Sequence, residues 1–191
     1  MIMDTSTTVT PLGPLTLVVD DGTVRAASFT DDPERLRPML DPDHRRAELR
    51  QVHDLGQVTR AVRAYFDGDP RAVDDLPVEQ SGNQYFQAAW KAMREIPPGT
   101  TVSYRALAGL AGDPSTARAA GFACASNHVV LIVPCHRVIR TDGTLGDYYY
   151  GLEVKRWLLR HEGVDVGLPL EVEPPLATAG AAARQAARAR K

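Results

Sequence analysis

The segment GPLTLVVDDGTVRAASF (residues 13–29) is the feature that most restricts how this chain can fold. Two runs of β-forming residues flank the pair Asp21-Gly22, which is favoured in tight hairpin turns. The sequence therefore predicts two antiparallel strands joined at that pair. Residues 31–44 are rich in Asp and Pro and predict a loop.

An amphipathic helix is predicted over residues 46–66, because apolar residues recur there at steps of three and four. The sequence DGDP ends this helix, and a short extended piece is predicted around residues 73–78. Together with the hairpin, these elements predict a small N-terminal α/β domain of sheet and helix over residues 1–80.

The second half is predicted to be mostly helical, with helices over residues 83–96 and 152–163. Between them, the run VVLIV (129–133) predicts a buried strand that ends at Pro134, because proline cannot donate to a ladder. Residues 140–151 predict a loop. The inward residues and the C-cap expected for the last helix are Leu152, Trp157, Leu158, Leu159 and Gly163.

Residues 101–112 and 113–127 predict two short helices joined by a tight turn, which is a helix-turn-helix arrangement. Ser103 is the expected N-cap of the first helix. Asp113 is expected to cap the second, with Pro114 at its first position. Such a pair reads DNA in some proteins and packs into the core of others, so the shape alone leaves both open.

The second of these helices carries small side chains almost throughout, with Arg118 as its only long cation. Small residues let a helix approach another surface closely, either a neighbouring helix or a nucleic-acid groove. An arginine on such a helix could enter a base stack or bind phosphate. The alternative is a solvated surface charge.

Cys135 and His136 stand side by side in PCHRV. A cysteine attacks as a thiolate, so it needs a base, and His136 is the nearest candidate. Adjacent residues of an extended chain point to opposite sides, so the pair requires a bend after Pro134 or a bridging water. Glu162 is the candidate acceptor that would orient His136. The motif alone does not exclude an inert buried thiol.

Composition excludes several classes of protein. The two cysteines among 191 residues are too few for a disulfide framework or a four-thiolate zinc site, and Cys124 is expected to be a small buried helix residue. No apolar stretch approaches the roughly 20 residues of a transmembrane helix, and the start has no secretory pattern. The net charge of −2 gives no global sign of nucleic-acid binding. We expect a cytoplasmic protein that binds neither membrane nor metal, with a weakly ordered Pro/Ala/Arg-rich tail over residues 166–191.

The motifs SYRALAGLAGDPSTARAAG, PCHRVI and DGTLGDYYYGLEVKRWLLRHEG occur in this order, with Asn127 seven residues before Pro134. Over about residues 83–163 the chain resembles the O6-alkylguanine-DNA alkyltransferases (methylated-DNA–protein-cysteine methyltransferases). The resemblance implies an α/β (α+β) protein with a DNA-binding and alkyl-transfer domain over residues 81–165. It also implies DNA repair by a single-turnover enzyme that flips the damaged base out of the helix and needs no cofactor.

The resemblance implies a role for each matched catalytic residue. Cys135 would accept the alkyl group irreversibly, His136 would be the base acting through a water, and Glu162 would orient His136. Asn127 would hold the turn that carries the nucleophile. Tyr148 would cover the flipped guanine and donate a hydrogen bond to O6.

The resemblance also implies a DNA surface on the helix-turn-helix. Arg118 would take the space of the flipped nucleotide from the minor groove, and Tyr104 would press on the 3′ phosphate. We expect a monomer on double-stranded DNA that contains O6-alkylguanine, and cooperative loading is left open. The other expected DNA contacts are Ser103, Ala117, Ala119 and Gly121.

The chain departs from the family pattern at His128, where proline is frequent, and in the lid at Asp147, Tyr149 and Tyr150, where small residues are frequent. His128 either replaces a turn residue or reaches a phosphate. The lid residues either narrow the pocket towards methyl adducts or simply cover it. The preferred alkyl size, activity on O4-alkylthymine and the role of the tail are left open by the sequence.

Two other functions compete with alkyl transfer. The first is a module that binds alkylation damage without transfer, as in alkyltransferase-like proteins, which lack the cysteine of this motif. The second is a hydrolase that uses Cys135, His136 and Glu162. Such a hydrolase would turn over repeatedly, and it would leave the small-residue helix with Arg118 unexplained.

Overall fold

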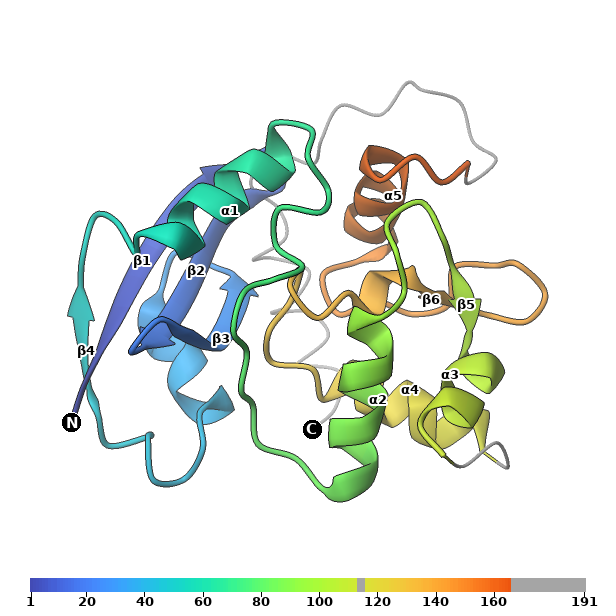
Figure 1. Cartoon of the computed structure of the whole chain (residues 1–191), viewed down its shortest axis with the longest axis horizontal. Helices are drawn as coiled ribbons and strands as arrows, with labels where there is room; N and C mark the ends of the chain where they lie inside the picture. Colours follow the sequence, from blue (N-terminus) through green and yellow to red (C-terminus); the bar gives the residue numbers. More distant parts are fainter. Residues whose placement is uncertain (113–115, 166–191) are drawn as a thin grey trace.

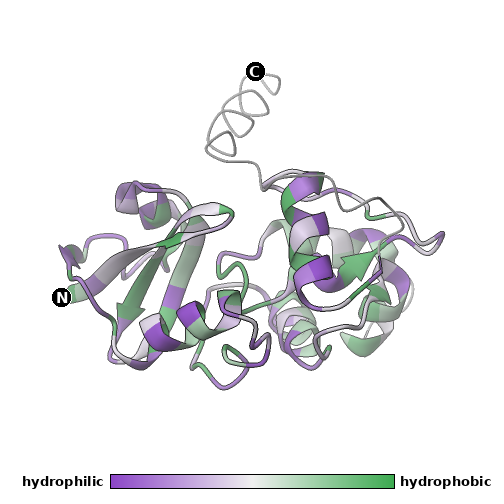
Figure 2. Cartoon of the chain, turned by 90° about the horizontal axis from the view of Figure 1, so that it is seen from above, coloured by the Kyte–Doolittle hydropathy of each residue, from purple (hydrophilic) through white to green (hydrophobic). Residues whose placement is uncertain are grey.

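The computed structural model describes residues 1–112 and 116–165, which form a sheet part and a helical part lying side by side (Figure 1, Figure 2). The expected tail over residues 166–191 lies outside the described residues, as do Asp113 and Pro114. Among the described helices, none is both long and apolar enough to span a membrane.

A mixed sheet forms the first part, with strand order β3-β2-β1-β4. Its strands are β1 (Ile2–Thr10), β2 (Gly13–Asp20), β3 (Thr23–Phe29) and β4 (Glu48–Gln51). The predicted hairpin is confirmed: Asp21 and Gly22 have φ of 45° and 75°, the left-handed pair that a tight hairpin turn requires. The strand β1, which pairs antiparallel to β2, was not predicted.

The two faces of the sheet are covered by different segments. The helix α1 (Gln57–Phe66) packs on one face, and the 3-10 helix η1 (Pro33–Met39) packs on the other, within the predicted loop. The helix predicted over residues 46–66 is wrong in its first half, because β4 lies there and pairs parallel to β1. Hydrogen bonds to the edge of β1 outweigh the helical spacing of the apolar residues, and α1 begins only after Gly56, which has φ of 65°.

The helical part contains the expected helices with adjusted ends. Leu152 is 44 % exposed, contrary to prediction, whereas Leu158 and Leu159 are buried as expected. The last helix ends at His161, with Glu162 at its C-cap and Gly163 following in the left-handed conformation. The elements are α2 (Gln84–Arg94), β5 (Val102–Ser103), α3 (Tyr104–Leu110), α4 (Ala117–Ala125), η2 (Cys135–Arg137), β6 (Val138–Ile139) and α5 (Leu152–His161).

Two predicted local features of this part differ from the structure. The N-cap of α4 is Thr116, so the helix begins later than predicted. The run VVLIV (129–133) is buried but is not a strand. Only Val129 forms a bridge, to Ala27 of β3, and the chain then turns through Leu131, which has φ of 75°. An apolar run indicates that a segment is buried, but it does not show whether that segment is a strand or a turn.

One hydrophobic cluster extends from the sheet through α1 and α2 to α5, across the predicted boundary between residues 80 and 81. Backbone hydrogen bonds tie the two parts together: Ala27 N donates to His128 O at 2.9 Å, and Val130 N donates to Ala27 O at 3.2 Å. The turn that precedes Cys135 is therefore hydrogen-bonded to β3. The division into domains at residue 80 stays a prediction.

Candidate active site

The chain bends sharply at Pro134, which has φ of −83° and ψ of 63°. Cys135 N donates to Val133 O at 2.9 Å, and Arg137 N donates to Pro134 O at 3.0 Å, so residues 135–137 form the 3-10 turn η2. Of the two geometries expected for Cys135 and His136, the bend after Pro134 is present. Cys135 is buried, with 8 % of the residue exposed, and His136 is fully buried.

Asn127 connects this turn to the end of α4. Its Nδ2 donates to Val133 O at 2.8 Å and to Cys135 Sγ at 3.3 Å, while its Oδ1 accepts from Val129 N at 3.1 Å. One side chain therefore fixes both the backbone of the turn and the sulfur atom.

Gln80 holds Asn127 in turn, and sequence reasoning missed it. Gln80 Nε2 donates to Asn127 Oδ1 at 3.1 Å, and Gln80 Oε1 accepts the backbone N–H of His128 at 2.8 Å. A proline at position 128 has no N–H to donate, so the departure at His128 supplies the partner of Gln80. No local pattern marks Gln80, which lies 47 residues from Asn127 in the chain.

A buried cluster surrounds the Glu162 carboxylate, with four side-chain hydrogen bonds. Its Oε1 is 2.8 Å from His136 Nε2 and accepts from Tyr65 Oη at 2.7 Å. Arg137 donates to Oε2 from Nε at 2.8 Å and to Oε1 from a terminal nitrogen at 3.0 Å. Tyr65 and Arg137 were not predicted as site residues. Arg137 stands in the PCHRV motif, and Tyr65 continues the buried face of α1.

Charge in this cluster is fixed by burial and by the partners. Burial alone would raise the pKa of Glu162, but His136 and Arg137 together hold that pKa well below its usual range. Burial lowers the pKa of His136, so the imidazole is neutral at pH 7. Because an ionised carboxylate only accepts, Nε2 carries the proton and Nδ1 keeps its lone pair. That Nδ1 has no hydrogen-bond partner within the described residues.

The thiol of Cys135 needs such a base. Burial raises its pKa, and the hydrogen bond from Asn127 and the charge of Lys155 only partly oppose this effect. The resting sulfur is therefore protonated at neutral pH. A protonated thiol, a neutral imidazole and a carboxylate together can generate a thiolate on demand.

The lid, the loop over residues 140–151, is held by the buried side chain of Lys155. Its Nζ donates to Val138 O at 2.6 Å and to Leu145 O at 2.5 Å, and lies about 6 Å from the ring centroids of Tyr104 and Tyr148. Tyr148 Oη is buried with no hydrogen-bond partner in the part of the chain that the structure covers. This loop thus presents a buried phenol that has no hydrogen-bond partner among the described residues.

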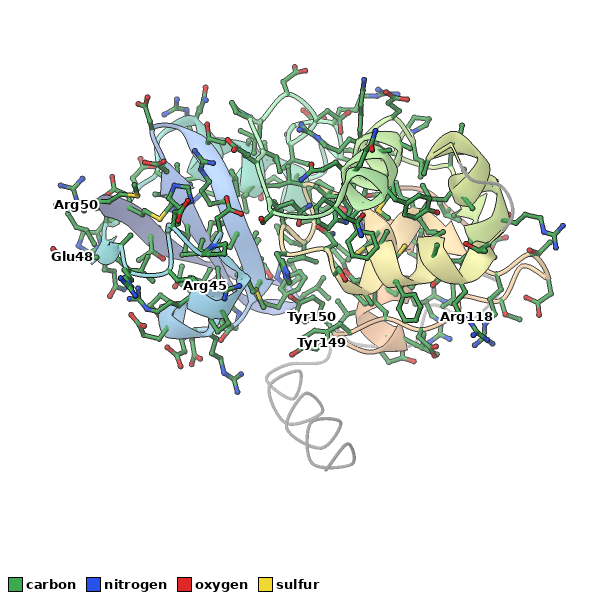
Figure 3. The ribbon with its side chains drawn as sticks, turned by 90° about the horizontal axis from the view of Figure 1, so that it is seen from below. Arg45, Glu48, Arg50, Arg118, Tyr149 and Tyr150 are labelled. Carbon is green, nitrogen blue, oxygen red and sulfur yellow. The ribbon has the colours of Figure 1, made fainter. Side chains whose placement is uncertain are left out.

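The lid is also fastened to the sheet. Tyr150 Oη lies 2.8 Å from Ser28 Oγ, and its ring packs edge-on against Phe29 with centroids 5.1 Å apart. Figure 3 shows Tyr149 and Tyr150 at the junction of the two parts, and Tyr149 is 69 % exposed. The tyrosines of the lid therefore have separate environments, and Asp147 is exposed.

The residues predicted to contact DNA lie on α3 and α4, apart from the Glu162 cluster. Arg118 is exposed and points into solvent (Figure 3). Tyr104 instead packs at the lid, where a Cβ at Gly146 would lie 3.1 Å from its ring. Ser103 Oγ accepts from Ala106 N at 3.1 Å and so is the N-cap of α3, as predicted. Ala117 is exposed, and Ala119 and Gly121 are half-buried.

Comparison with known proteins places this arrangement in a family. The family model for the 6-O-methylguanine DNA methyltransferase DNA binding domain matches residues 84–164. A methylated-DNA–protein-cysteine methyltransferase of Shigella flexneri is 38 % identical over 157 residues, which are 81 % of this chain and 92 % of that protein. The chain belongs to the methylated-DNA–protein-cysteine methyltransferase family.

The folds of solved methyltransferases agree with this membership. The crystal structure of a Mycobacterium tuberculosis O6-methylguanine methyltransferase is 29 % identical, with a TM-score of 0.69 over 89 % of this chain and 97 % of that one. Mycobacterium tuberculosis OGT in complex with DNA is 30 % identical, with a TM-score of 0.69 over 83 % and 92 %. The expected α/β fold is therefore confirmed, and this methyltransferase shares its sheet part as well as its helical part with these relatives.

Proposed function

We propose that this protein repairs O6-alkylguanine in double-stranded DNA by irreversible transfer of the alkyl group to Cys135. One observation carries the proposal: the sulfur that Asn127 holds belongs to a turn whose next residue, His136, is bound to a buried carboxylate. A module that only binds damage has no use for this sulfur and base. The family membership of the chain favours the same reaction.

The chemistry follows from the protonation states. Glu162 keeps the proton of His136 on Nε2, so Nδ1 takes the thiol proton of Cys135 through a water. The thiolate attacks the alkyl carbon, the carbon–sulfur bond forms, and the bond from that carbon to O6 breaks. The electron pair of the broken bond stays on guanine, where Tyr148 donates a hydrogen bond to O6. The proton that His136 took from the thiol returns through water to neutralise the guanine anion, which leaves His136 neutral again.

A hydrolase is the weaker alternative because of the product. Transfer leaves a thioether on Cys135, and water does not displace a thioether as it displaces a thioester. The same sulfur therefore reacts once, and the protein is consumed. Repeated turnover would require an acyl intermediate instead.

The proposal is tested by mixing the protein with a duplex that contains one O6-methylguanine and measuring the intact mass. We expect each chain to gain the mass of one methylene group, located on Cys135 by peptide mapping, and to be inactive in a second round. The same duplex with unmodified guanine is the control. Continued turnover, or tight binding without an adduct, would contradict the proposal.

For the DNA surface, we propose that α3 and α4 act as a helix-turn-helix on the minor groove, with the protein bound as a monomer. Arg118, exposed on a helix of small residues, would fill the space of the flipped nucleotide. Tyr104 would press on the adjoining phosphate from its place beside the lid. Exposed Ala117 and half-buried Ala119 and Gly121 would allow the close approach of the backbone to the groove.

Replacing Arg118 by alanine should slow repair in duplex DNA about 100-fold, because flipping a stacked base costs a few kcal/mol that the arginine offsets. The reaction with the free base O6-benzylguanine or O6-methylguanine should change less than about twofold, since no flipping is required. Both rates are measured from the loss of labelled alkyl group. Arg60→Ala, an exposed arginine of α1, is the matched control. An equal loss on both substrates would remove Arg118 from this role.

A further inference from the structure

The helix α1 of the sheet part reaches the catalytic cluster through one side chain. Tyr65 is fully buried, and its hydroxyl donates to Glu162 Oε1 at 2.7 Å. The tyrosine is held on two sides: its ring packs against Phe66 with centroids 5.2 Å apart, and its backbone oxygen lies 2.6 Å from His161 Nε2. The hydroxyl therefore has little freedom to leave the carboxylate.

The oxygen that Tyr65 contacts is the one that orients the base. Glu162 Oε1 accepts from Tyr65, His136 and one terminal nitrogen of Arg137, whereas Oε2 accepts from Arg137 Nε. Burial raises the pKa of Tyr65 well above its usual value, and the neighbouring carboxylate raises it further. Tyr65 thus stays protonated at neutral pH and donates to the carboxylate.

We propose that Tyr65 is a positioning residue for alkyl transfer, whose hydroxyl holds Glu162 Oε1 where that oxygen accepts the Nε2–H of His136. This inference rests on the proposed function, because it assigns Tyr65 a part in generating the thiolate. It gives the sheet part a direct effect on the chemistry, through a contact between residues 97 positions apart.

The hydroxyl also affects the proton balance of His136. A donor on Oε1 withdraws charge from the carboxylate, so its removal makes Glu162 a stronger partner for the imidazolium. The imidazolium would then be favoured, and the base would be neutral only at higher pH. Removal of the Tyr65 hydroxyl leaves the other ionisable groups around His136 and Glu162 unchanged. These groups include Arg137, Lys155, Asp74, His161 and Cys135.

The test is Tyr65→Phe, which keeps the buried ring and removes only the hydroxyl. We expect methyl transfer at pH 7 to slow about tenfold, the effect of one lost hydrogen bond to a charged group. We also expect the acid limb of the rate–pH profile to move to higher pH by about half to one unit. The pKa of the His136 imidazole, measured by NMR titration of the unreacted protein, should move in the same direction, to a higher value.

Thr59→Val is the matched control, because Thr59 is a buried residue of the same helix whose hydroxyl accepts from Leu55 N at 2.8 Å, away from Glu162. It should lose comparable stability and keep the wild-type rate and pH profile. The inference fails if Tyr65→Phe behaves like Thr59→Val, or if its rate falls equally at every pH with no shift of His136. Wild-type protein measured in parallel separates the proposed function from the role of Tyr65. Failure of the wild type to form the adduct would contradict the proposed function. Normal transfer by the wild type, with an unaffected Tyr65→Phe, would contradict only the role of Tyr65.

Discussion

Replacing Cys135 by serine is expected to abolish alkyl transfer while leaving the affinity for damaged duplex DNA within about twofold. Serine keeps the size and accepts the hydrogen bond from Asn127, so the turn is preserved. Its hydroxyl is far less acidic and less nucleophilic towards carbon than a thiol, so the transfer rate should fall by at least about 10⁴-fold. Intact-mass analysis measures the adduct, and a gel-shift titration measures binding.

Cys124→Ser is the control for this change. Burial raises the pKa of the Cys124 thiol well above its usual value. We expect this variant to acquire the methyl group at the wild-type rate. Transfer by Cys135→Ser, or loss of transfer in Cys124→Ser, would show that the acceptor is not Cys135.

Replacing Glu162 by glutamine should weaken both the chemistry and the fold. The buried guanidinium of Arg137 would lose its counter-charge, and breaking a buried pair in this way costs about 3–5 kcal/mol in the free energy of unfolding. A neutral amide also no longer fixes the His136 tautomer, so transfer should slow about 10²–10³-fold, as expected when a general base is lost. Urea unfolding measures the first effect, and single-turnover kinetics measure the second.

The double variant Glu162→Gln, Arg137→Met separates the two effects. It removes the unpaired charge and should recover part of the lost stability, although Ile96 O loses the donor that Arg137 provides at 2.6 Å. It should not recover transfer, because His136 still lacks its carboxylate. Recovery of the rate along with the stability would show that Glu162 acts on the fold alone.

Local chemistry was sufficient for several elements. The Asp21-Gly22 pair predicted the hairpin because few residues adopt its left-handed turn, and the Ser103 cap marked the start of α3. The PCHRV motif and the resemblance pointed to Cys135, His136 and Glu162, and the structure pairs Glu162, at the end of α5, with His136 in the turn that also contains Cys135. Their catalytic roles stay predictions.

Other features depend on partners that are distant in the chain. Pairing with β1 makes a strand of residues that have helical spacing. The VVLIV run forms a turn whose start is held by Ala27 of β3, which hydrogen-bonds to His128 O and Val130 N. Gln80 and Tyr65 carry no motif, because their importance arises only when tertiary folding places them against Asn127 and Glu162.

The order of residues along the chain was therefore enough to identify the family and the type of reaction and to predict the nucleophile, since these depend on residue chemistry at short spacing. Tertiary packing alone decided how the turn of Cys135 is held and how the Glu162 carboxylate is charged. Burial in the shared core removes solvent from Glu162, so its state depends on Arg137, His136 and a tyrosine from the sheet part. The LIVPCHRVIR stretch contains the two residues proposed to react, and the surrounding fold buries both and binds His136 to Glu162.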